Sequence, residues 1–163
     1  MIISTIVLLL FLYYPIIIIY FSPGGFKISA GADYIKIPKI NAEAEIISNV
    51  DPWKKEVYEK ALEKGVAKAS GFDNFLFAHS SLPPWKMTRT NTPFLRLNEL
   101  NRGDQIVVHK DGKDKIYIVS IKREVWPNEV AFLLNKGEEE LILQTCTPLG
   151  TDLKRLLIFA KLT

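Results

Sequence analysis

Cys146, the only cysteine of the chain, and Arg155 are the two residues best suited to covalent chemistry. A free thiol has a pKa of about 8.5, so a cysteine nucleophile needs a base or a nearby positive charge to act at neutral pH. Arg155 supplies a permanent cation, and its fork of N–H donors suits a carbonyl oxygen that becomes an oxyanion. These residue types predict acyl transfer through a cysteine nucleophile, provided that the chain also supplies a proton carrier.

The proton carrier must be His79 or His109, the only histidines of the chain. His79 follows a short apolar run that predicts a strand, and a functional group in that place would rest on a rigid support. His109 lies beside a predicted turn, where we expect an exposed strand end. A lone histidine is more often structural than catalytic, and a lone cysteine is more often a small buried hydrophobe. The combination favours His79 as the proton carrier and Cys146 as the nucleophile.

The elements that must position these residues are mostly strands. Residues 141–160 predict two apolar strands joined by a loop that holds Pro148 and Gly150. A short loop returns the chain to the edge that it left, so Cys146 and Arg155 should lie near the same rim of a sheet. At least seven short strand candidates and one clear amphipathic helix, over residues 51–66, predict a mainly β fold, a barrel or a sandwich.

Residues 2–21 carry no charged side chain and are dominated by large apolar residues. Twenty helical residues at 1.5 Å each reach about 30 Å, the hydrocarbon thickness of a bilayer. We therefore expect a transmembrane anchor over residues 1–21, a linker over 22–33 and one β domain over 34–163. A cleaved signal peptide or a buried core helix are the alternatives, and the first is disfavoured by the absence of a basic start.

Composition excludes some classes of function. The formal net charge of +3 mixes acidic and basic residues and does not indicate nucleic-acid binding. A single cysteine excludes an internal disulfide. The acidic run of residues 138–140 offers carboxylates for calcium, but three consecutive side chains cannot all converge on one ion, so a solvated turn is favoured and no cofactor is expected.

The chain resembles the sortases, membrane-anchored cysteine transpeptidases of bacterial surfaces. The most specific match is Leu143-Gln-Thr145-Cys146 followed by Arg155, which is similar to the family pattern Thr-Leu-x-Thr-Cys with an arginine on the next strand. Ile142 departs from that pattern, where the family has Thr, and this affects the assignment of a subgroup more than catalysis. Four further stretches match in the expected order: Ile37-Pro38-Lys39-Ile40, Trp53 with Ala61–Val66, Asn74–His79 and Leu97–Asp104.

The resemblance implies a closed sortase-like β-barrel with one or two short helices, and a mechanism. Cys146 would attack the carbonyl between Thr and Gly of a Leu-Pro-x-Thr-Gly-like sorting signal and form a thioester. His79 would move protons, Arg155 would bind the oxyanion, and Thr145 would help to line the oxyanion site. The loop before the cysteine strand, residues 124–140, would help to form the peptide groove, and its Trp126, Val130 and Phe132 would either contact the substrate or only pack the loop onto the barrel.

The expected partners are surface proteins that bear a C-terminal sorting signal, an amine acceptor from a cell-wall precursor or a pilin, and the membrane. The resemblance also implies a bacterial cell membrane crossed once, with the catalytic domain outside the cytoplasm. A non-catalytic, membrane-tethered β binding domain is the main alternative. An L,D-transpeptidase fits less well, because its arginine follows the cysteine within a few residues, and a papain-like protease would place its cysteine before its histidine.

Overall fold

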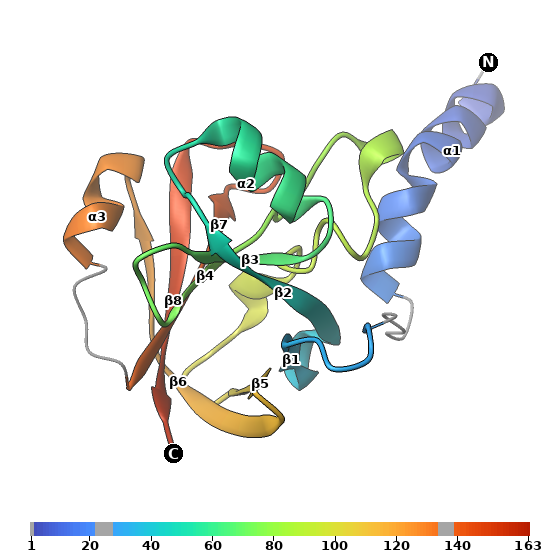
Figure 1. Ribbon diagram of the computed structural model, residues 1–163. Helices are drawn as coiled ribbons and strands as arrows, with labels where there is room; N and C mark the ends of the chain where they lie inside the picture. Colours follow the sequence, from blue (N-terminus) through green and yellow to red (C-terminus); the bar gives the residue numbers. More distant parts are fainter. Residues whose placement is uncertain (1, 22–27, 134–138) are drawn as a thin grey trace.

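The computed structural model describes residues 2–21, 28–133 and 139–163, and of residues 2, 15, 132 and 133 only the backbone. Within these residues the chain forms a closed barrel of eight strands in the order β1-β2-β3-β4-β7-β8-β6-β5 (Figure 1). The strands are β1 (Tyr34–Ile37), β2 (Ala42–Val50), β3 (Val66–Ala69), β4 (Phe75–Phe77), β5 (Gln105–Lys110), β6 (Lys113–Val125), β7 (Glu140–Thr147) and β8 (Lys154–Leu162). The helices are α1 (Ile2–Phe21), α2 (Lys55–Leu62) and α3 (Val130–Leu133), with 3-10 turns at Pro38–Ile40, Pro84–Lys86, Leu97–Glu99 and Pro127–Glu129.

The barrel is mixed rather than wholly antiparallel. β2 pairs with β3 in parallel, and β4 pairs with β7 in parallel, whereas the other neighbouring strands are antiparallel. A parallel pair needs a crossover between its strands, and α2 supplies the one between β2 and β3. The strand pattern left a barrel or a sandwich open, and the closed β-barrel that the resemblance implies is confirmed. Closure pairs both edges of the described sheet.

The core of the barrel is built from inward-facing aliphatic side chains of every strand. Ile35, Ile106, Leu143 and Ile158 are at most 1% exposed and lie in one cluster. Successive side chains of a strand point to opposite faces, so the residues between these core positions face outward. On β7 the odd-numbered positions from Leu141 to Thr147 are the inward ones.

The helix predicted over residues 51–66 is shorter than expected. α2 begins at Lys55, because Asp51 accepts a hydrogen bond from the Trp53 backbone N–H at 3.0 Å and forms a turn before the helix. Trp53 is 75% exposed instead of packed, and Val66 belongs to β3. Gly65 separates helix and strand, where a Cβ would collide with the backbone carbonyl of Glu45 on β2.

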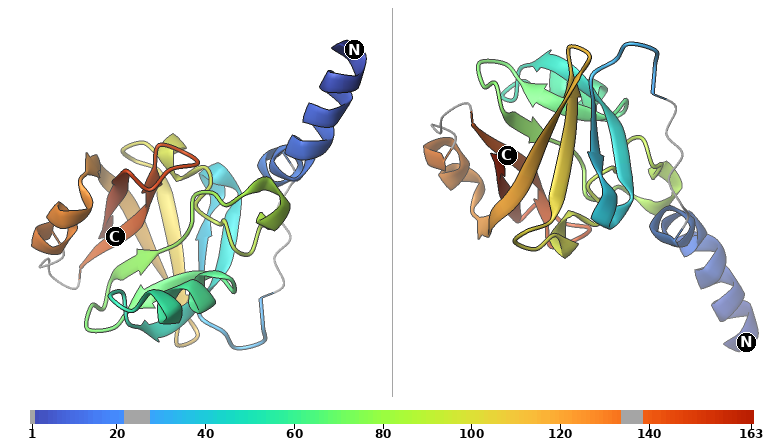
Figure 2. Two further views of the ribbon diagram at one scale, coloured as in Figure 1. Left: turned by 90° about the horizontal axis from the view of Figure 1, so that it is seen from above. Right: turned by 90° about the horizontal axis from the view of Figure 1, so that it is seen from below.

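The segment predicted as a membrane anchor forms α1, which projects away from the barrel on the side opposite to α3 (Figures 1 and 2). No helix in the described part of the chain is both long and apolar enough to cross a membrane, so the predicted crossing is not confirmed. The first half of the predicted linker, residues 22–27, lies outside the described residues.

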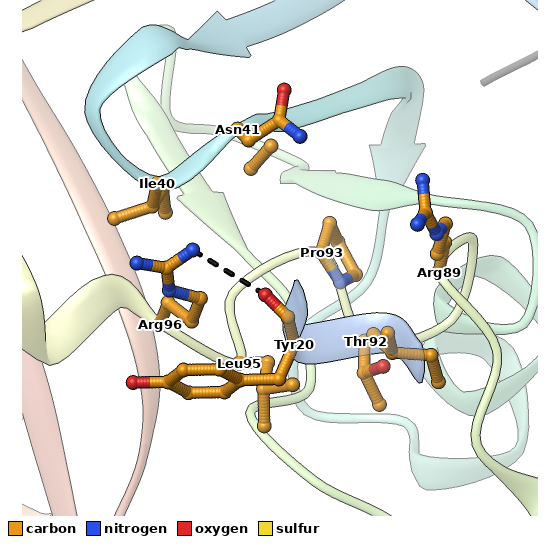
Figure 3. A pocket seen from close by; sticks show the side chains of 10 residues that line it. Tyr20, Ile40, Asn41, Arg89, Thr92, Pro93, Leu95 and Arg96 are labelled. Carbon is orange, nitrogen blue, oxygen red and sulfur yellow. Dashed lines mark hydrogen bonds between the residues drawn. The ribbon is translucent and has the colours of Figure 1, made fainter. Parts of the chain in front are cut away.

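The carboxyl end of α1 contacts the barrel through polar groups. The Tyr20 hydroxyl donates to Glu99 Oε1 at 2.7 Å, and the Arg96 guanidinium lies 4.7 Å from the centre of the Tyr20 ring. Arg96 also pairs with Glu99 at 2.6 Å. It donates to the Tyr20 backbone carbonyl at 3.5 Å, the bond drawn as a dashed line in Figure 3. One end of α1 is therefore held on the barrel beside a small pocket that Ile40 and Thr92 help to line.

Candidate active site

The β7–β8 hairpin places Cys146 directly opposite Arg155 in its antiparallel register. Directly opposed residues of an antiparallel pair point to the same face, so thiol and guanidinium share one face of the sheet. Arg155 Nη1 donates to the backbone carbonyls of Asp152 at 2.7 Å and Lys154 at 3.1 Å. The hairpin loop thus holds one nitrogen of the guanidinium. The placement of Cys146 and Arg155 at a common rim agrees with the sequence prediction.

Cys146 occupies an outward, half-buried position of β7. Its neighbours Thr145 and Thr147 face the other way, into the barrel, and are buried. An outward position at the end of a strand leaves the sulfur at the surface of the domain, whereas a shift of one residue would enclose it. The lone cysteine is therefore not an inward-facing core residue.

His79 reaches the same end of the barrel on the strand beside β7. β4 runs parallel to β7, with Phe77 opposite Gln144, and the Ala78 N–H continues the ladder by donating to the Gln144 carbonyl at 3.1 Å. Continuing this register by two residues places His79 beside Cys146. Cys146 and Arg155 thus lie on β7 and β8, and His79 lies two residues beyond the end of the adjacent strand β4, although the histidine and the cysteine are far apart in the sequence.

Thr145 does not face the side of the sheet that carries Cys146. Its side chain is 3% exposed, and its hydroxyl donates to the Ala78 carbonyl at 2.7 Å. The expected part of this hydroxyl in lining the oxyanion site remains a prediction. This hydrogen bond joins β7 to Ala78, the residue immediately before His79. It therefore fixes the point at which His79 leaves the sheet.

Burial sets the resting charge of the two titrating groups. Burial raises the pKa of the Cys146 thiol. The Arg155 cation lowers this pKa, and the Asp152 carboxylate raises it further. Burial also lowers the pKa of the His79 imidazole, while the Glu59 carboxylate of α2 raises it. A neutral thiol beside a neutral imidazole therefore predominates at neutral pH.

The expected groove residues do not all lie together. Trp126 is 55% exposed and carries the Lys154 ammonium 5.3 Å from its ring centre. Lys154 lies opposite Thr147 in the register, so it belongs to the face that Cys146 does not occupy. Val130 begins α3 and packs, half-buried, against the core. The side chain of Phe132 lies outside the described residues.

His109 occupies a site of its own. It lies within β5, where it pairs with β1 and β6, and it is half-buried rather than exposed at a strand end as predicted. Its Nδ1 lies 2.6 Å from Asp114 Oδ1, and its ring stacks on Tyr34 with the ring centres 4.7 Å apart. This histidine is engaged by other groups and shares no strand with Cys146.

Within the described ranges, no group of three or more His, Cys, Asp or Glu side chains could hold a metal ion. Glu138, the first residue of the acidic run considered for calcium, lies outside those ranges. One pocket in the described part of the chain lies beside Tyr20, and another lies beside Lys68 and Tyr117. Neither of these pockets is lined by Cys146, His79 or Arg155.

Two charged residues near the site escaped the sequence analysis. Glu59 acts on His79 from α2, and Asp152 acts on Cys146 from the hairpin loop. Glu59 belongs to a Lys and Glu face typical of any solvated helix, and it forms an ion pair with Lys55 at 3.6 Å. Sequence pattern offers no signal for such residues, because only the packing of α2 on the barrel, where Tyr58 lies against Phe77 of β4, brings Glu59 near the imidazole.

Comparison with known families decides what kind of barrel this is. The family model described as the sortase domain matches residues 35–163. The chain belongs to the sortase family. The match covers all eight strands except for Tyr34, the first residue of β1. It also includes His79, Cys146 and Arg155. The barrel is therefore a sortase-family domain.

Sortases of known structure share this fold. Sortase C-1 from Actinomyces oris is 28% identical with a TM-score of 0.67, over 80% of this chain and 72% of that one. Sortase C from Clostridium perfringens, determined with the C-terminal cell wall sorting motif, is 28% identical with a TM-score of 0.63, over 80% and 69%. Sortase C1 of GBS Pilus Island 1 is 25% identical with a TM-score of 0.66, over 80% of this chain and 63% of that one. Among curated proteins no match is found.

Proposed function

We propose that the chain is a cysteine transpeptidase that cleaves a Leu-Pro-x-Thr-Gly-like sorting signal and transfers the acyl group to an amine of the cell envelope. The observation that supports this most is the cross-strand pair of Cys146 and Arg155 on the outer face of the barrel. The adjacent position of His79 completes the set. Acyl transfer needs a nucleophile, a proton carrier and an oxyanion clamp, and each of these three residues suits one role.

In the first half of the reaction, the Cys146 sulfur attacks the carbonyl carbon between Thr and Gly of the signal. Arg155 N–H groups bind the oxygen while it carries negative charge. The C–N bond then breaks, the leaving amine takes a proton from His79, and a thioester remains on Cys146. The neutral resting pair must first pass the thiol proton to His79, which the neighbouring Arg155 cation favours by stabilising the thiolate.

In the second half, an incoming amine attacks the thioester carbonyl and loses a proton to His79. The new amide forms, the C–S bond breaks, and the thiol is restored. The acceptor is an amine of a cell-wall precursor or of a pilin. The C. perfringens sortase C whose structure holds a C-terminal cell wall sorting motif supports a substrate of this class for the present chain as well.

We further propose that α1 attaches the domain to the outer side of a bacterial membrane. Its side chains carry no charge, and large apolar residues are exposed along it, including Phe11 at 82% and Phe21 at 76%. Attachment there would hold the site near membrane-bound precursors. The protein should float with vesicles of anionic and zwitterionic phospholipid. The double substitution Leu8→Lys with Phe11→Lys should abolish flotation. The control double substitution Trp53→Lys with Ile121→Lys, at exposed positions of the barrel domain, should not. Equal flotation of all three proteins would reject the attachment.

The covalent mechanism is tested by Cys146→Ala. This variant should lose all cleavage of a Leu-Pro-x-Thr-Gly-type peptide while its thermal unfolding stays that of the wild type. Incubation of the wild type with a peptide library and candidate amines, followed by mass analysis, should yield both a thioester adduct and amide products. Retained cleavage in Cys146→Ala would reject the mechanism. A well-folded wild type that forms no adduct with any peptide would favour the non-catalytic binding domain.

A further inference from the structure

Two loops flank the candidate site, and one side chain joins them. The first loop follows His79, and the second is the β7–β8 loop between Cys146 and Arg155. Ser81 Oγ of the first accepts a hydrogen bond from the Gly150 N–H of the second at 2.8 Å, across 69 residues of sequence. Gly150 has a φ of +84°, a conformation that favours glycine, so the turn that presents this N–H would be strained with most other residues at position 150.

The β7–β8 loop in turn supports the guanidinium. Thr151 bonds back to the Pro148 carbonyl through both its N–H and its hydroxyl, at 3.0 and 2.8 Å, so the turn around Gly150 is internally tied. Asp152 follows at once, and its carbonyl accepts from Arg155 Nη1 at 2.7 Å. A displacement of Gly150 would therefore move the carbonyl on which Arg155 rests.

The same loop decides the balance of charge at the sulfur. The groups that act on Cys146 are the Arg155 cation and the Asp152 carboxylate, with opposite effects on the thiolate. Both belong to the segment that Ser81 holds, and His79 stands on the remaining side, two residues before Ser81. The position of this loop thus governs how closely the cation approaches the thiol.

We propose that Ser81 is a positioning residue, which holds the β7–β8 loop through Gly150 and thereby keeps the Arg155 guanidinium directed at Cys146. The inference rests on the proposed role of Arg155 and adds a residue to which no motif points. Ser81 touches neither the thiol nor the imidazole. Its effect passes through a loop whose movement a single hydrogen bond restrains.

The test is a double-mutant cycle read by the rate at which iodoacetamide alkylates Cys146 at neutral pH. Ser81→Ala should slow alkylation about two- to tenfold, the range expected for the loss of one hydrogen bond. Arg155→Ala should slow it at least as much, because removing the cation raises the thiol pKa. In the Arg155→Ala background, Ser81→Ala should have no further effect, because the group that it positions is absent.

Matched variants separate positioning from damage to the fold. Ser81→Thr keeps the accepting oxygen and should restore the wild-type rate. Ser80→Ala removes a buried hydroxyl that has no hydrogen-bond partner among the described residues, and it should leave the rate unchanged. Thermal unfolding of each variant shows whether the fold is intact.

Three outcomes would overturn the proposal: an unchanged rate in Ser81→Ala, the same slowing in both backgrounds, or no rescue by Ser81→Thr. Alkylation needs no peptide substrate, so this test can succeed or fail independently of the test of the proposed transpeptidase function. If Ser81→Ala slows alkylation only when Arg155 is present but the protein cleaves no peptide, the transpeptidase function is contradicted while the positioning role of Ser81 is supported. An unchanged rate in Arg155→Ala would overturn both.

Discussion

The two histidines of the chain lie in opposite kinds of environment. His109 is held between an aspartate and a tyrosine ring within β5, with its Nδ1 2.6 Å from Asp114. His79 stands just after β4 beside Cys146, and its ring makes no hydrogen bond to the described residues. A proton carrier must lie within reach of the reacting group, and His79 lies beside the Cys146 strand, whereas His109 lies on β5 between β1 and β6. The difference teaches that surroundings, more than residue type, define the proton carrier.

The strongest test of this contrast removes each imidazole in turn. His79→Ala should lower the rate of sorting-peptide cleavage by about 10²- to 10⁴-fold, the usual contribution of a positioned acid–base group. His109→Ala is the matched control and should keep the rate within about twofold, since its ring lies outside the site. Cleavage is followed by the release of a labelled peptide. Equal losses in the two variants would break the contrast.

Of the cations on β8, only Arg155, at the end beside Cys146, should contribute to catalysis. Arg155→Ala should lower kcat by about 10²- to 10³-fold, the cost of removing one oxyanion donor. Lys161→Ala removes a cation from the far end of the same strand, opposite Glu140, and should leave kcat unchanged. Steady-state kinetics with the same peptide decides this. A comparable loss in Lys161→Ala would mean that general charge, and not the pairing with Cys146, is responsible.

The buried hydroxyl that secures the approach to His79 should be worth a measurable amount of stability. Thr145→Val leaves the Ala78 carbonyl without its donor, so the free energy of unfolding should fall by about 1–3 kcal/mol. Thr163 makes a similar hydroxyl-to-carbonyl bond with Ile116 at an exposed position, where water replaces it, so Thr163→Val should cost under about 0.5 kcal/mol. Urea unfolding of both variants provides the comparison, and equal losses would contradict it.

The smallest expected effect concerns the charge on α2. Glu59 raises the pKa of His79, so Glu59→Gln should lower that pKa further. Proton NMR titration of the His79 imidazole measures this change. Glu63→Gln, one turn further along the same stretch, is the control. A rise in the His79 pKa, or a shift of similar size in Glu63→Gln, would show that Glu59 does not act on this ring.

The sequence predicted best where a local pattern and the final contact coincide. The β7–β8 hairpin is two apolar runs around Pro148 and Gly150, and its register follows from that short connection. β3 was missed because Val66 continues the helical spacing of the residues before it and the strand has only four residues. α3 begins at Val130 in a segment expected to be a loop. Short elements that depend on distant partners leave little local signal.

The site divides in the same way. His79, Cys146 and Arg155 could be proposed because few residues of the chain can do their chemistry and because they match a family pattern. Trp126 could not be assigned to a face, since its orientation depends on where β6 ends, opposite Arg155 on β8, and on the contact of its ring with Lys154. The bond between Ser81 and Gly150 was equally out of reach, because it joins two loops whose conformations depend on the closed barrel.

The cross-strand pairing of Cys146 with Arg155 also limits how this domain can change in length. One residue inserted into β7 just before Cys146 would turn the sulfur toward the barrel interior and shift its partner on β8. Residues added between Pro148 and Leu153 would leave both strands in phase. Variation in length is therefore excluded from the two strands, and within the loop it is compatible with the site only where the bond from Gly150 to Ser81 and the support of Arg155 by Asp152 are kept.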